Sequence, residues 1–557
     1  MGNHRLSSIV DFKSHYEYKA YLGERRGEGV SMDVWFVFLV SLCVGALLKA
    51  LLDLSRTPKS GSKLPPGPPS VPFIGSLFWF RRSLWEFESA LRSLHHKYGP
   101  VISLRLGFAR TFVFISSHSL AYRTLIQQSA AFADRPPPPA TSLIANSNRH
   151  NISSAGYGPN WRLFRRNLAS RLFHPSRGLA AFAPLRCRVL RILLDRLAAQ
   201  SKSAEFVAVL EHFRYAMFCL LVFMCFGGDD DAIDEGTVNK IMAVQIHMIR
   251  SLNRFRILNF LPRLTKIVLR NRWKELKGEV KGRENLFIPL IRRRSRAKQS
   301  GVDEEPRDLC YVDTLIDLEL PEEGNRRLTE GEVVSLCSEF LTGGTDTTAT
   351  ALQWIMANLV KYPHVQQKLF AEIRDVIGEK QGPVVAVEEE DLQKMPYLKA
   401  VILEGLRRHP PGHFVLPHSV TEEVELEGYV IPKMSTVNFM VADMGWDPKV
   451  WEDPMVFRPE RFMGGEEVDL TGSRGIKMMP FGAGRRICPG MGVAMLHMEL
   501  FVANLVWRFE WEAAAVDLSE KAEFTVAMKE PLRAKLSPRV LPLLHSKKPL
   551  EMRVESK

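Results

Sequence analysis

The most continuous hydrophobic pattern of the chain lies between Val333 and Leu359, where apolar side chains recur with helical spacing. The pattern predicts one long helix. Its middle carries two glycines and four polar residues, Gly343, Gly344, Thr345, Asp346, Thr347 and Thr348. Such residues are unfavourable inside a helix. We therefore expect the helix to open there, leaving an unpaired backbone carbonyl beside a groove for a small ligand. A purely structural kink is the alternative.

A second apolar segment covers residues 34–48, and residues 50–52 continue it beyond Lys49. If Lys49 reaches towards the lipid surface, the segment approaches the ~20 residues that a bilayer span needs. The pattern predicts a single membrane anchor at residues 32–54. A cleaved signal peptide is the alternative, but a basic start and a small-residue cleavage site are both missing. Three basic residues follow the span and place the rest of the chain in the cytosol, namely Arg56, Lys59 and Lys63.

The segments around this anchor differ in composition. Residues 1–31 are polar and of mixed charge, so we expect a dispensable or mis-annotated extension, with Met32 as the native start. Residues 55–70 are basic and proline-rich, which predicts a stiff hinge. This leaves residues 71–545 for the body of the protein and residues 546–557 for a C-terminal tail.

A glycine-rich segment near the C-terminus surrounds one cysteine, Cys488. Gly484 and Gly490 permit close backbone approach and unusual φ angles, and Pro489 suits the first position of a following helix. Cys488 is therefore predicted to lie at a helix N-terminus, where backbone N–H groups favour the ionised sulfur that binds metal. Phe481 is expected to shield the sulfur from water. The alternative is a buried structural cysteine.

Two arginines precede this cysteine. Arg486 can offer a charged pair of donors to a haem propionate, and Arg485 is left to face solvent or a partner. The whole segment resembles the haem loop of the cytochrome P450 superfamily, Phe-x-x-Gly-x-Arg-x-Cys-x-Gly, at five positions, Phe481, Gly484, Arg486, Cys488 and Gly490. The resemblance extends from about Leu64 to about Pro531.

The resemblance implies a fold and a cofactor. The expected fold is mainly α with small β-sheets near residues 101–114 and 415–432, preceded by a single N-terminal transmembrane helix, and residues 71–545 form one haem-thiolate catalytic domain. The expected cofactor is haem b, iron protoporphyrin IX, with Cys488 as the axial metal ligand.

The resemblance also assigns roles to individual residues. Asp346 and Thr347 match the acid and the alcohol that supply protons during oxygen activation, so they are the expected catalytic residues. The cofactor-binding residues are expected to be Cys488, Arg486, Phe481, Trp161, Arg165 and His418. For His418, a solvated turn histidine is an equal alternative.

Glu404 and Arg407 lie three residues apart on one predicted helical face. Their apolar neighbours would bury them, and a buried ion pair needs further hydrogen bonds. Arg461 is the candidate third partner. The family uses this triad to stabilise the fold beneath the haem, so its expected role is structural.

The implied function is a membrane-anchored monooxygenase that inserts one oxygen atom of O₂ into an apolar small molecule. Electrons come from NADPH through cytochrome P450 reductase, and cytochrome b5 is a second candidate partner. A fatty-acid hydroxylase is the runner-up. A haem-thiolate isomerase or dehydratase and a noncatalytic haem sensor are alternatives of another class.

The stretch Pro410–His418 with Met478 and Met479 resembles the plant A-type subfamily eighty-nine A. This resemblance implies specialised or degradative metabolism. The expected location is the endoplasmic reticulum membrane, with the catalytic domain facing the cytosol.

Composition changes this picture little. Of 557 residues, 46% are hydrophobic and 25% are charged, as expected of a large catalytic body. The net charge of +13 would suit nucleic acid, but no aromatic-interleaved basic platform accompanies it, so we exclude nucleic acid and assign the charge to an acidic reductase and to lipid. A basic, apolar stretch at residues 255–273 is a candidate second lipid contact, with a solvated helix pair as the alternative. Seven cysteines without metal-type spacing indicate a reducing compartment.

Overall fold

The computed structural model describes residues 37–45, 63–68, 83–106, 110–228, 233–300, 310–378, 386–465 and 468–539. The chain divides into two units, residues 1–60 and 61–557. In the first unit residues 37–45 are helical, inside the predicted anchor. The predictions for residues 1–31 and 546–557, and most of those for the anchor and the hinge, lie outside the described residues.

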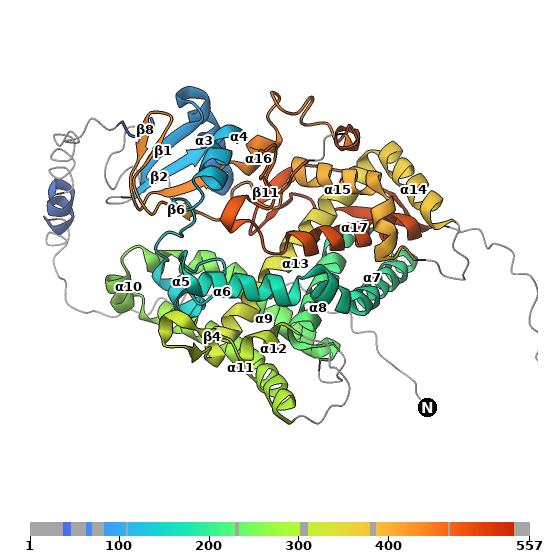
Figure 1. Ribbon diagram of the computed structural model, residues 1–557, viewed down its shortest axis with the longest axis horizontal. Helices are drawn as coiled ribbons and strands as arrows, with labels where there is room; N and C mark the ends of the chain where they lie inside the picture. Colours follow the sequence, from blue (N-terminus) through green and yellow to red (C-terminus); the bar gives the residue numbers. More distant parts are fainter. Residues whose placement is uncertain are drawn as a thin grey trace, which may run out of the picture. The chain divides into compact units, whose positions relative to one another are not determined.

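The second unit is built around the helix α13 (Glu330–Lys361), which contains the pattern predicted as one helix (Figure 1). Its N-terminus carries a capping box, because the Thr329 N–H donates to Glu332 at 2.8 Å and the Glu332 N–H donates to the Thr329 hydroxyl at 3.3 Å. Most of its side chains are buried, and one continuous core joins it to α8 (Val209–Phe226), α15 (Pro396–Arg408) and α17 (Met491–Arg508).

The predicted opening of α13 is wrong, since the helix runs through residues 343–348 without interruption. Two hydroxyl groups explain why the polar segment is tolerated. Thr345 donates to the Leu341 carbonyl and Thr347 to the Gly343 carbonyl, both at 2.7 Å. These hydroxyl groups bond to the helix's own backbone, so both residues keep a helical backbone conformation.

The predicted β region is present as a four-stranded sheet in the order β1-β2-β9-β6. Strands β1 (Val101–Leu106) and β2 (Arg110–Ile115) are antiparallel, and β9 (Thr436–Phe439) runs parallel to β2. Strand β6 (His418–Ser419) completes the sheet antiparallel to β9. In Figure 1 this sheet and α3 (Leu84–Tyr98) lie apart from the large helical region. The fold is therefore mainly α with small sheets, as predicted.

The remaining elements complete the described part of the chain. The other α-helices are α4 (His118–Tyr122), α5 (Ala140–Ala145), α6 (Pro159–Asn167), α7 (Ala183–Ser203), α9 (Glu235–Phe255), α10 (Pro262–Val268), α11 (Arg270–Ser300), α12 (Tyr311–Ile316), α14 (Pro363–Ile377) and α16 (Val441–Gly445). Short 3₁₀ and π helices are η1 (Arg123–Gln127), η2 (Ser147–Arg149), η3 (Leu168–Leu172), η4 (Pro175–Leu179), η5 (Arg256–Asn259), η6 (Pro321–Glu323), η7 (Glu389–Lys394), η8 (Pro459–Phe462) and η9 (Gly484–Arg486). The other strands are β3 (Val207–Ala208), β4 (Glu319–Leu320), β5 (Arg326–Arg327), β7 (Val424–Leu426), β8 (Tyr429–Ile431), β10 (Phe509–Glu512), β11 (Glu520–Ala522), β12 (Val526–Met528) and β13 (Arg533–Pro538).

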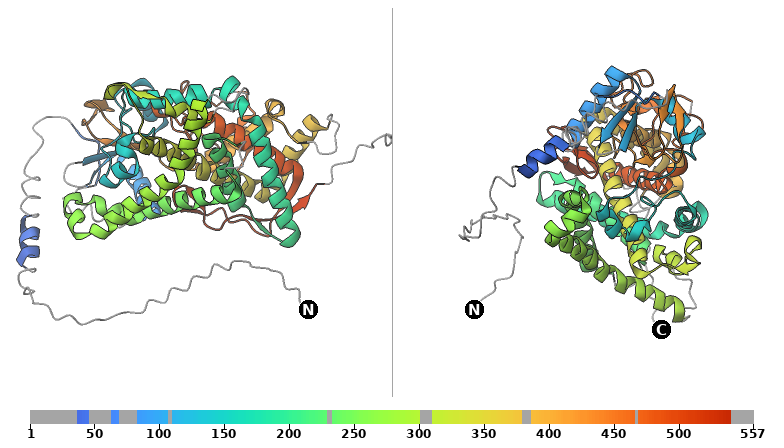
Figure 2. Two further views of the ribbon diagram at one scale, coloured as in Figure 1. Left: turned by 90° about the horizontal axis from the view of Figure 1, so that it is seen from below. Right: turned by 90° about the vertical axis from the view of Figure 1, so that its left-hand side faces the viewer.

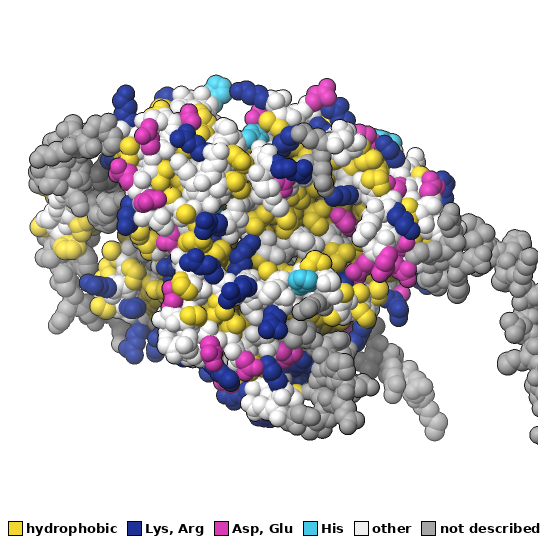
Figure 3. Space-filling model, in the orientation of Figure 1, with side chains coloured by type: hydrophobic (Ala, Val, Ile, Leu, Met, Phe, Trp, Pro, Cys, Tyr) yellow, Lys and Arg dark blue, Asp and Glu magenta, His cyan; other side chains and the backbone are white. Residues whose placement is uncertain are grey.

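Two helices bear on the membrane question. Within the described residues, α8 alone is long and apolar enough to cross a membrane, but 78% of it is buried inside the protein, as in a core helix. By contrast, α10 lies at one end of the helical body (Figures 1 and 2). Apolar side chains are exposed on it and just before it, namely Phe260, Ile267 and Val268. In Figure 3 apolar and basic side chains lie next to one another at this end.

Candidate functional site

The loop that carries Cys488 is closed by its own backbone. The Cys488 N–H donates to the Phe481 carbonyl at 2.8 Å, and Gly484 has a left-handed φ of +70°. A Cβ at Gly484 would overlap the carbonyl oxygen of Leu125, so this position requires glycine, as predicted. Phe481 is half-buried and packs against the main core.

Two details of this loop differ from the sequence prediction. Gly490 has an ordinary φ of −91° and is the N-cap of α17, which begins at Met491. Pro489 therefore precedes the cap and does not occupy the first helical position. Two residues, Pro489 and Gly490, therefore separate Cys488 from the first residue of the helix.

Replacing Gly484 by alanine is expected to lower the stability of the protein by about 2 kcal/mol or more, because the added Cβ is both strained by a positive φ and opposed by Leu125. The measurements are the thermal midpoint and the haem content per mole of protein. Gly464→Ala is the matched control, since a Cβ there meets nothing within 4 Å. Equal haem content in both variants would contradict this interpretation of the loop.

Burial raises the pKa of the Cys488 thiol, while the Gly490 N–H and the charge of Arg165 act in the opposite direction. The backbone donor near the helix start therefore favours the thiolate as predicted, but burial outweighs it. A cation held at the sulfur would reverse this balance, because metal coordination deprotonates a thiol outright.

Arg486 belongs to the cysteine loop, is half-buried and bonds to backbone carbonyls. It donates to Ala133 at 2.7 Å, to Ala155 at 2.8 Å and to Ile152 at 3.3 Å. Burial and the neighbouring guanidinium of Arg135 together lower the pKa of Arg486 to about 9. The predicted propionate donor is thus a cation that other cations surround.

Three more arginines complete this group, which we call the arginine cluster: Arg135, Arg149, Arg165 and Arg486. Arg135 is buried, and it donates to the carbonyls of Leu416 at 2.7 Å and Pro417 at 2.8 Å. Burial lowers the pKa of Arg135 to about 10. The carboxylates that stabilise its charge are Asp134 and Glu339.

The arginine cluster fits a dianionic group. Four arginines outnumber Asp134 and Glu339 by two charges, and the two propionates of haem b supply that number. Two buried donors in the same region lack a hydrogen-bond partner among the described residues, the indole Nε1 of Trp161 and Nη2 of Arg149. Buried cations and orphaned donors are costly unless anions pair with them. The residues present therefore fit haem.

The structure brings the predicted pair Trp161 and Arg165 together on α6. The Arg165 guanidinium carbon lies 5.7 Å from the Trp161 ring, and that of Arg486 lies 4.3 Å from it. Arg165 also donates to the Ile487 carbonyl at 2.6 Å, next to the cysteine. Three predicted cofactor-binding side chains thus share one location.

His418 lies in strand β6 and is buried, which excludes the solvated turn that was its alternative. Its Nδ1 lies 2.7 Å from the Phe132 carbonyl oxygen, a contact in which the ring donates. Burial lowers the pKa of His418 to about 3, with Arg135 and Arg486 acting in the same direction. The neutral ring then presents a lone pair at Nε2, so donation to a propionate requires His418 to gain a proton as the anion binds.

The two predicted catalytic residues lie in the uninterrupted middle of α13, close to the exposed Gly343. Gly343 is exposed in an otherwise buried helix, and a Cβ there would meet nothing within 4 Å. Thr347 lies one turn later, with its hydroxyl on the Gly343 carbonyl. Asp346 points to α8, where it pairs with Arg214 at 2.9 Å.

Sequence reasoning missed Arg135, Arg149 and Arg214. Arg135 follows Asp134 in a proline-rich loop with no helical or strand pattern, and its contacts lie 281 and 282 residues further along the chain. Arg214 could have been suspected, because an arginine among apolar residues of a core helix requires a buried acid.

Comparison with known proteins gives one consistent family. A family model described as Cytochrome P450 matches residues 65–537. The chain is 44% identical to Cytochrome P450 89A9 of Arabidopsis thaliana over 518 residues, covering 90% of this chain and 98% of the relative. It is 33% identical to Geraniol 8-hydroxylase of Catharanthus roseus, covering 90% and 99%.

Solved structures agree on the fold. A zebrafish cytochrome P450 solved with progesterone superposes with a TM-score of 0.67 and 23% identity, covering 81% of this chain and 99% of that one. A second zebrafish structure, solved with abiraterone, gives a TM-score of 0.63 at 22% identity.

Proposed function

The chain belongs to the cytochrome P450 family, and we propose that it is a membrane-anchored monooxygenase of plant specialised or degradative metabolism that acts on an apolar organic substrate. Family membership makes it a haem-dependent oxidoreductase with an axial cysteine thiolate. The observation that carries the proposal is the placement of Cys488 beside the arginine cluster, with the exposed Gly343 of α13 in the same unit.

The cofactor is held by residues already described. Cys488 would ligate the iron, and Arg135, Arg149, Arg165, Arg486 and Trp161 would receive the propionates. His418 lies in the same region as a neutral ring whose Nδ1–H donates to the Phe132 carbonyl. Bound haem supplies the activation of O₂ and the insertion of one oxygen atom into a C–H bond. The chain's own contribution is to orient the ring, neutralise its carboxylates and exclude water from the sulfur.

Asp346 and Thr347 would control protons beside the exposed Gly343 of α13. Thr347 holds its hydroxyl proton on the Gly343 carbonyl and can pass it to a ligand in the open space. Asp346 is kept in an ion pair with Arg214, whose side chain is 21% exposed, so the pair connects the helix to solvent. Proton entry from water to Asp346, whose side chain is 18% exposed and is oriented by Arg214, and from there to Thr347 is the route we propose.

Thr347→Ala is expected to lower the amount of hydroxylated product formed per NADPH several-fold while NADPH consumption continues, because only proton delivery is impaired. The measurement is the ratio of product to NADPH and to hydrogen peroxide released. Thr345→Ala is the matched control, since that hydroxyl also bonds one turn back but is buried. An unchanged product ratio in Thr347→Ala would contradict the assigned role.

Membrane attachment is supported by two segments. The apolar run at residues 32–54 is the proposed single-pass anchor of the endoplasmic reticulum, with the catalytic unit in the cytosol. The second support is the exposed face at α10, where Ile267 is 77% exposed beside Arg263 and Lys266. An apolar face next to basic side chains suits an anionic lipid surface. The proposed electron donor is NADPH-cytochrome P450 reductase, with cytochrome b5 as a second partner.

The substrate class is narrowed only by relatives. Geraniol 8-hydroxylase and Drimenol monooxygenase of Persicaria hydropiper, both 33% identical to this chain, act by name on geraniol and on drimenol. These names support an apolar small molecule of specialised metabolism. A fatty acid is the second candidate class.

The proposed function is tested in vesicles that hold the full chain and a plant reductase. Consumption of NADPH and O₂ together with a product heavier by one oxygen atom supports it. Turnover of substrate without NADPH or O₂ would identify an isomerase or dehydratase. Haem binding without turnover of any apolar substrate in a broad screen would identify a sensor or carrier.

A further inference from the structure

Between α5 and α6 the chain forms a segment that we call the roof strap, residues 147–157. Its first three residues, Ser147, Asn148 and Arg149, have left-handed φ angles of 43°, 54° and 75°. Such a run of non-glycine residues is strained and persists only where surrounding contacts fix it. The roof strap is therefore held in place by its partners.

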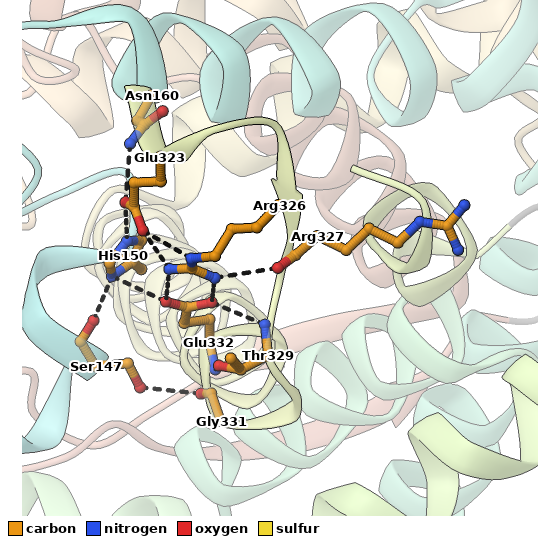
Figure 4. Close-up of polar contacts among 9 residues, drawn as sticks. All are labelled: Ser147, His150, Asn160, Glu323, Arg326, Arg327, Thr329, Gly331 and Glu332. Atoms are coloured by element: carbon orange, nitrogen blue, oxygen red, sulfur yellow. Dashed lines mark hydrogen bonds and ion pairs between the residues drawn. The ribbon is translucent and has the colours of Figure 1, made fainter. Parts of the chain in front are cut away.

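The first anchor of the roof strap is His150 (Figure 4). Its Nε2 lies 2.7 Å from Glu323, and its Nδ1 lies 2.6 Å from the Ser147 carbonyl oxygen and 3.3 Å from Glu332 at the start of α13. These side chains are a possible metal donor set. However, the Arg326 guanidinium already lies between the two carboxylates, at 2.7 Å from Glu332, and supplies the positive charge. The first anchor is thus an ion-pair network.

The second anchor is Glu339, two turns further along α13 than Glu332. Its two carboxylate oxygens accept the N–H groups of Ile152 at 2.7 Å and Ser153 at 2.6 Å. A carboxylate that receives two backbone donors is a strong, geometrically specific contact. Glu339 therefore fixes the middle of the roof strap.

The other side of the roof strap faces the arginine cluster. The carbonyls of Ile152 and Ala155 accept from Arg486, and that of Ser153 accepts from Arg135 at 2.9 Å. The peptide group between Ile152 and Ser153 links the two sides directly, because its N–H donates to Glu339 and its carbonyl accepts from Arg486. Neighbouring dipoles aligned in this way strengthen one another.

We propose that Glu339 is a positioning residue for the haem, acting through the roof strap on the arginine cluster and setting the electrostatic field at the propionates. The inference rests on the proposed haem site. Glu339 touches neither substrate nor cofactor. It holds the carbonyls that orient Arg135 and Arg486, and it supplies one of the two carboxylates that oppose their charge.

The consequence is that the charge of the Glu339 carboxylate affects the midpoint potential of the haem. Removing the negative charge leaves the arginine cluster more positive, which favours the reduced haem and raises its midpoint potential. Removing the two hydrogen bonds also frees the roof strap, so its amide protons exchange faster. Burial raises the pKa of Glu339, and Arg135 opposes this. Arg135 and Tyr311 of α12 are the other titratable groups that face Glu339.

The test compares Glu339→Gln with Glu372→Gln in the full-length holoenzyme. Glu372 is a matched control, because its carboxylate also accepts two consecutive backbone N–H groups, those of Tyr397 and Leu398, both at 2.8 Å. We expect Glu339→Gln to raise the midpoint potential and to speed amide exchange in residues 147–157 by about tenfold or more. Glu372→Gln is expected to leave both at their wild-type values.

Two further measurements separate the effect of the charge of Glu339 from that of its side-chain length. Both can be made even if Glu339→Gln does not fold. Glu339→Asp keeps the charge but cannot reach both N–H groups, so it is expected to speed strap exchange with little change in potential. In the wild type the potential is expected to rise as pH falls through the raised pKa of Glu339, a slope that Glu339→Gln lacks. A wild-type midpoint potential that does not change with pH in this range would overturn the proposal.

The remaining outcomes are also decisive. If Glu339→Gln leaves the potential or the strap exchange unchanged, or if Glu372→Gln changes both equally, Glu339 is not a positioning residue. The carbon monoxide spectrum of the same samples keeps this separate from the proposed function. A wild type without the thiolate band would overturn the haem site itself, whereas a normal band with unchanged potentials would overturn only the role of Glu339.

Discussion

Cys488→Ala is expected to abolish the strongly red-shifted band that thiolate-ligated haem shows in the reduced, carbon monoxide difference spectrum, and to remove all monooxygenase activity. The physical reason is that the sulfur is the electron-donating axial ligand, which no neighbouring side chain of the loop can replace. The measurement uses membrane-expressed protein, with haem content determined in parallel.

A matched control makes this result specific. Cys187→Ala removes an exposed cysteine and is expected to keep both the band and the activity. Burial raises the pKa of the Cys488 thiol, so the free thiol contributes little anionic character without iron. A band that survived in Cys488→Ala would exclude this residue as the ligand, and the mechanism built on it would fall.

The sequence predicted those parts of the site that lie within a short stretch of chain. The cysteine loop, the α13 segment with Asp346 and Thr347, and the Trp161–Arg165 pair each depend on spacings of a few residues, and local backbone geometry fixes such spacings. The structure places Trp161, Arg165, Arg486 and Cys488 together, as the interpretation required.

The residues of the candidate site that could not be predicted from the sequence lie in loops. Arg135 and the roof strap, which includes Arg149, lie in irregular stretches of chain on either side of α5. Neither stretch has a hydrophobic periodicity from which its backbone conformation could be predicted. Their partners in the cysteine loop and on α13 are distant in sequence, so only the folded chain brings them together. The arginine cluster also cannot be predicted from composition, because it depends on which arginines lie close together in the folded chain.

Two errors concern local backbone geometry. The polar run of α13 was expected to open the helix, but the hydroxyls of Thr345 and Thr347 bond to the helix backbone. Pro489 was expected at the first position of the following helix, but Gly490 is the N-cap and the helix begins at Met491. In both cases the residue type was recognised, but the backbone around it differs from its common preference.

The Glu404–Arg407 pair is as deeply buried as any charge in the described residues. Both side chains are 0% exposed, and the pair is bonded twice, at 2.7 and 2.9 Å. Arg461 donates to the same carboxylate at 3.1 Å, as predicted, and the Arg458 N–H adds a bond at 2.8 Å. Glu404 therefore joins α15 to η8 and balances two arginine charges.

Glu404→Gln is expected to lower the free energy of unfolding by about 3–5 kcal/mol, because it leaves the Arg407 charge buried without its carboxylate. A total stability of about 5–15 kcal/mol makes such a loss large enough to reduce the yield of folded haem protein. The measurements are the fraction of expressed chain that binds haem and the apparent thermal midpoint.

An exposed pair of the same geometry provides the control for this loss. Glu330 accepts two bonds from Arg292, at 2.6 and 2.9 Å, but both side chains lie on the surface. Glu330→Gln is therefore expected to cost at most about 1 kcal/mol. A similar, small loss in both variants would mean that water reaches Arg407 in the mutant, and the triad would then be a minor contributor to the fold. A large loss confined to Glu404→Gln identifies burial, and not the ion pair as such, as the origin of the effect.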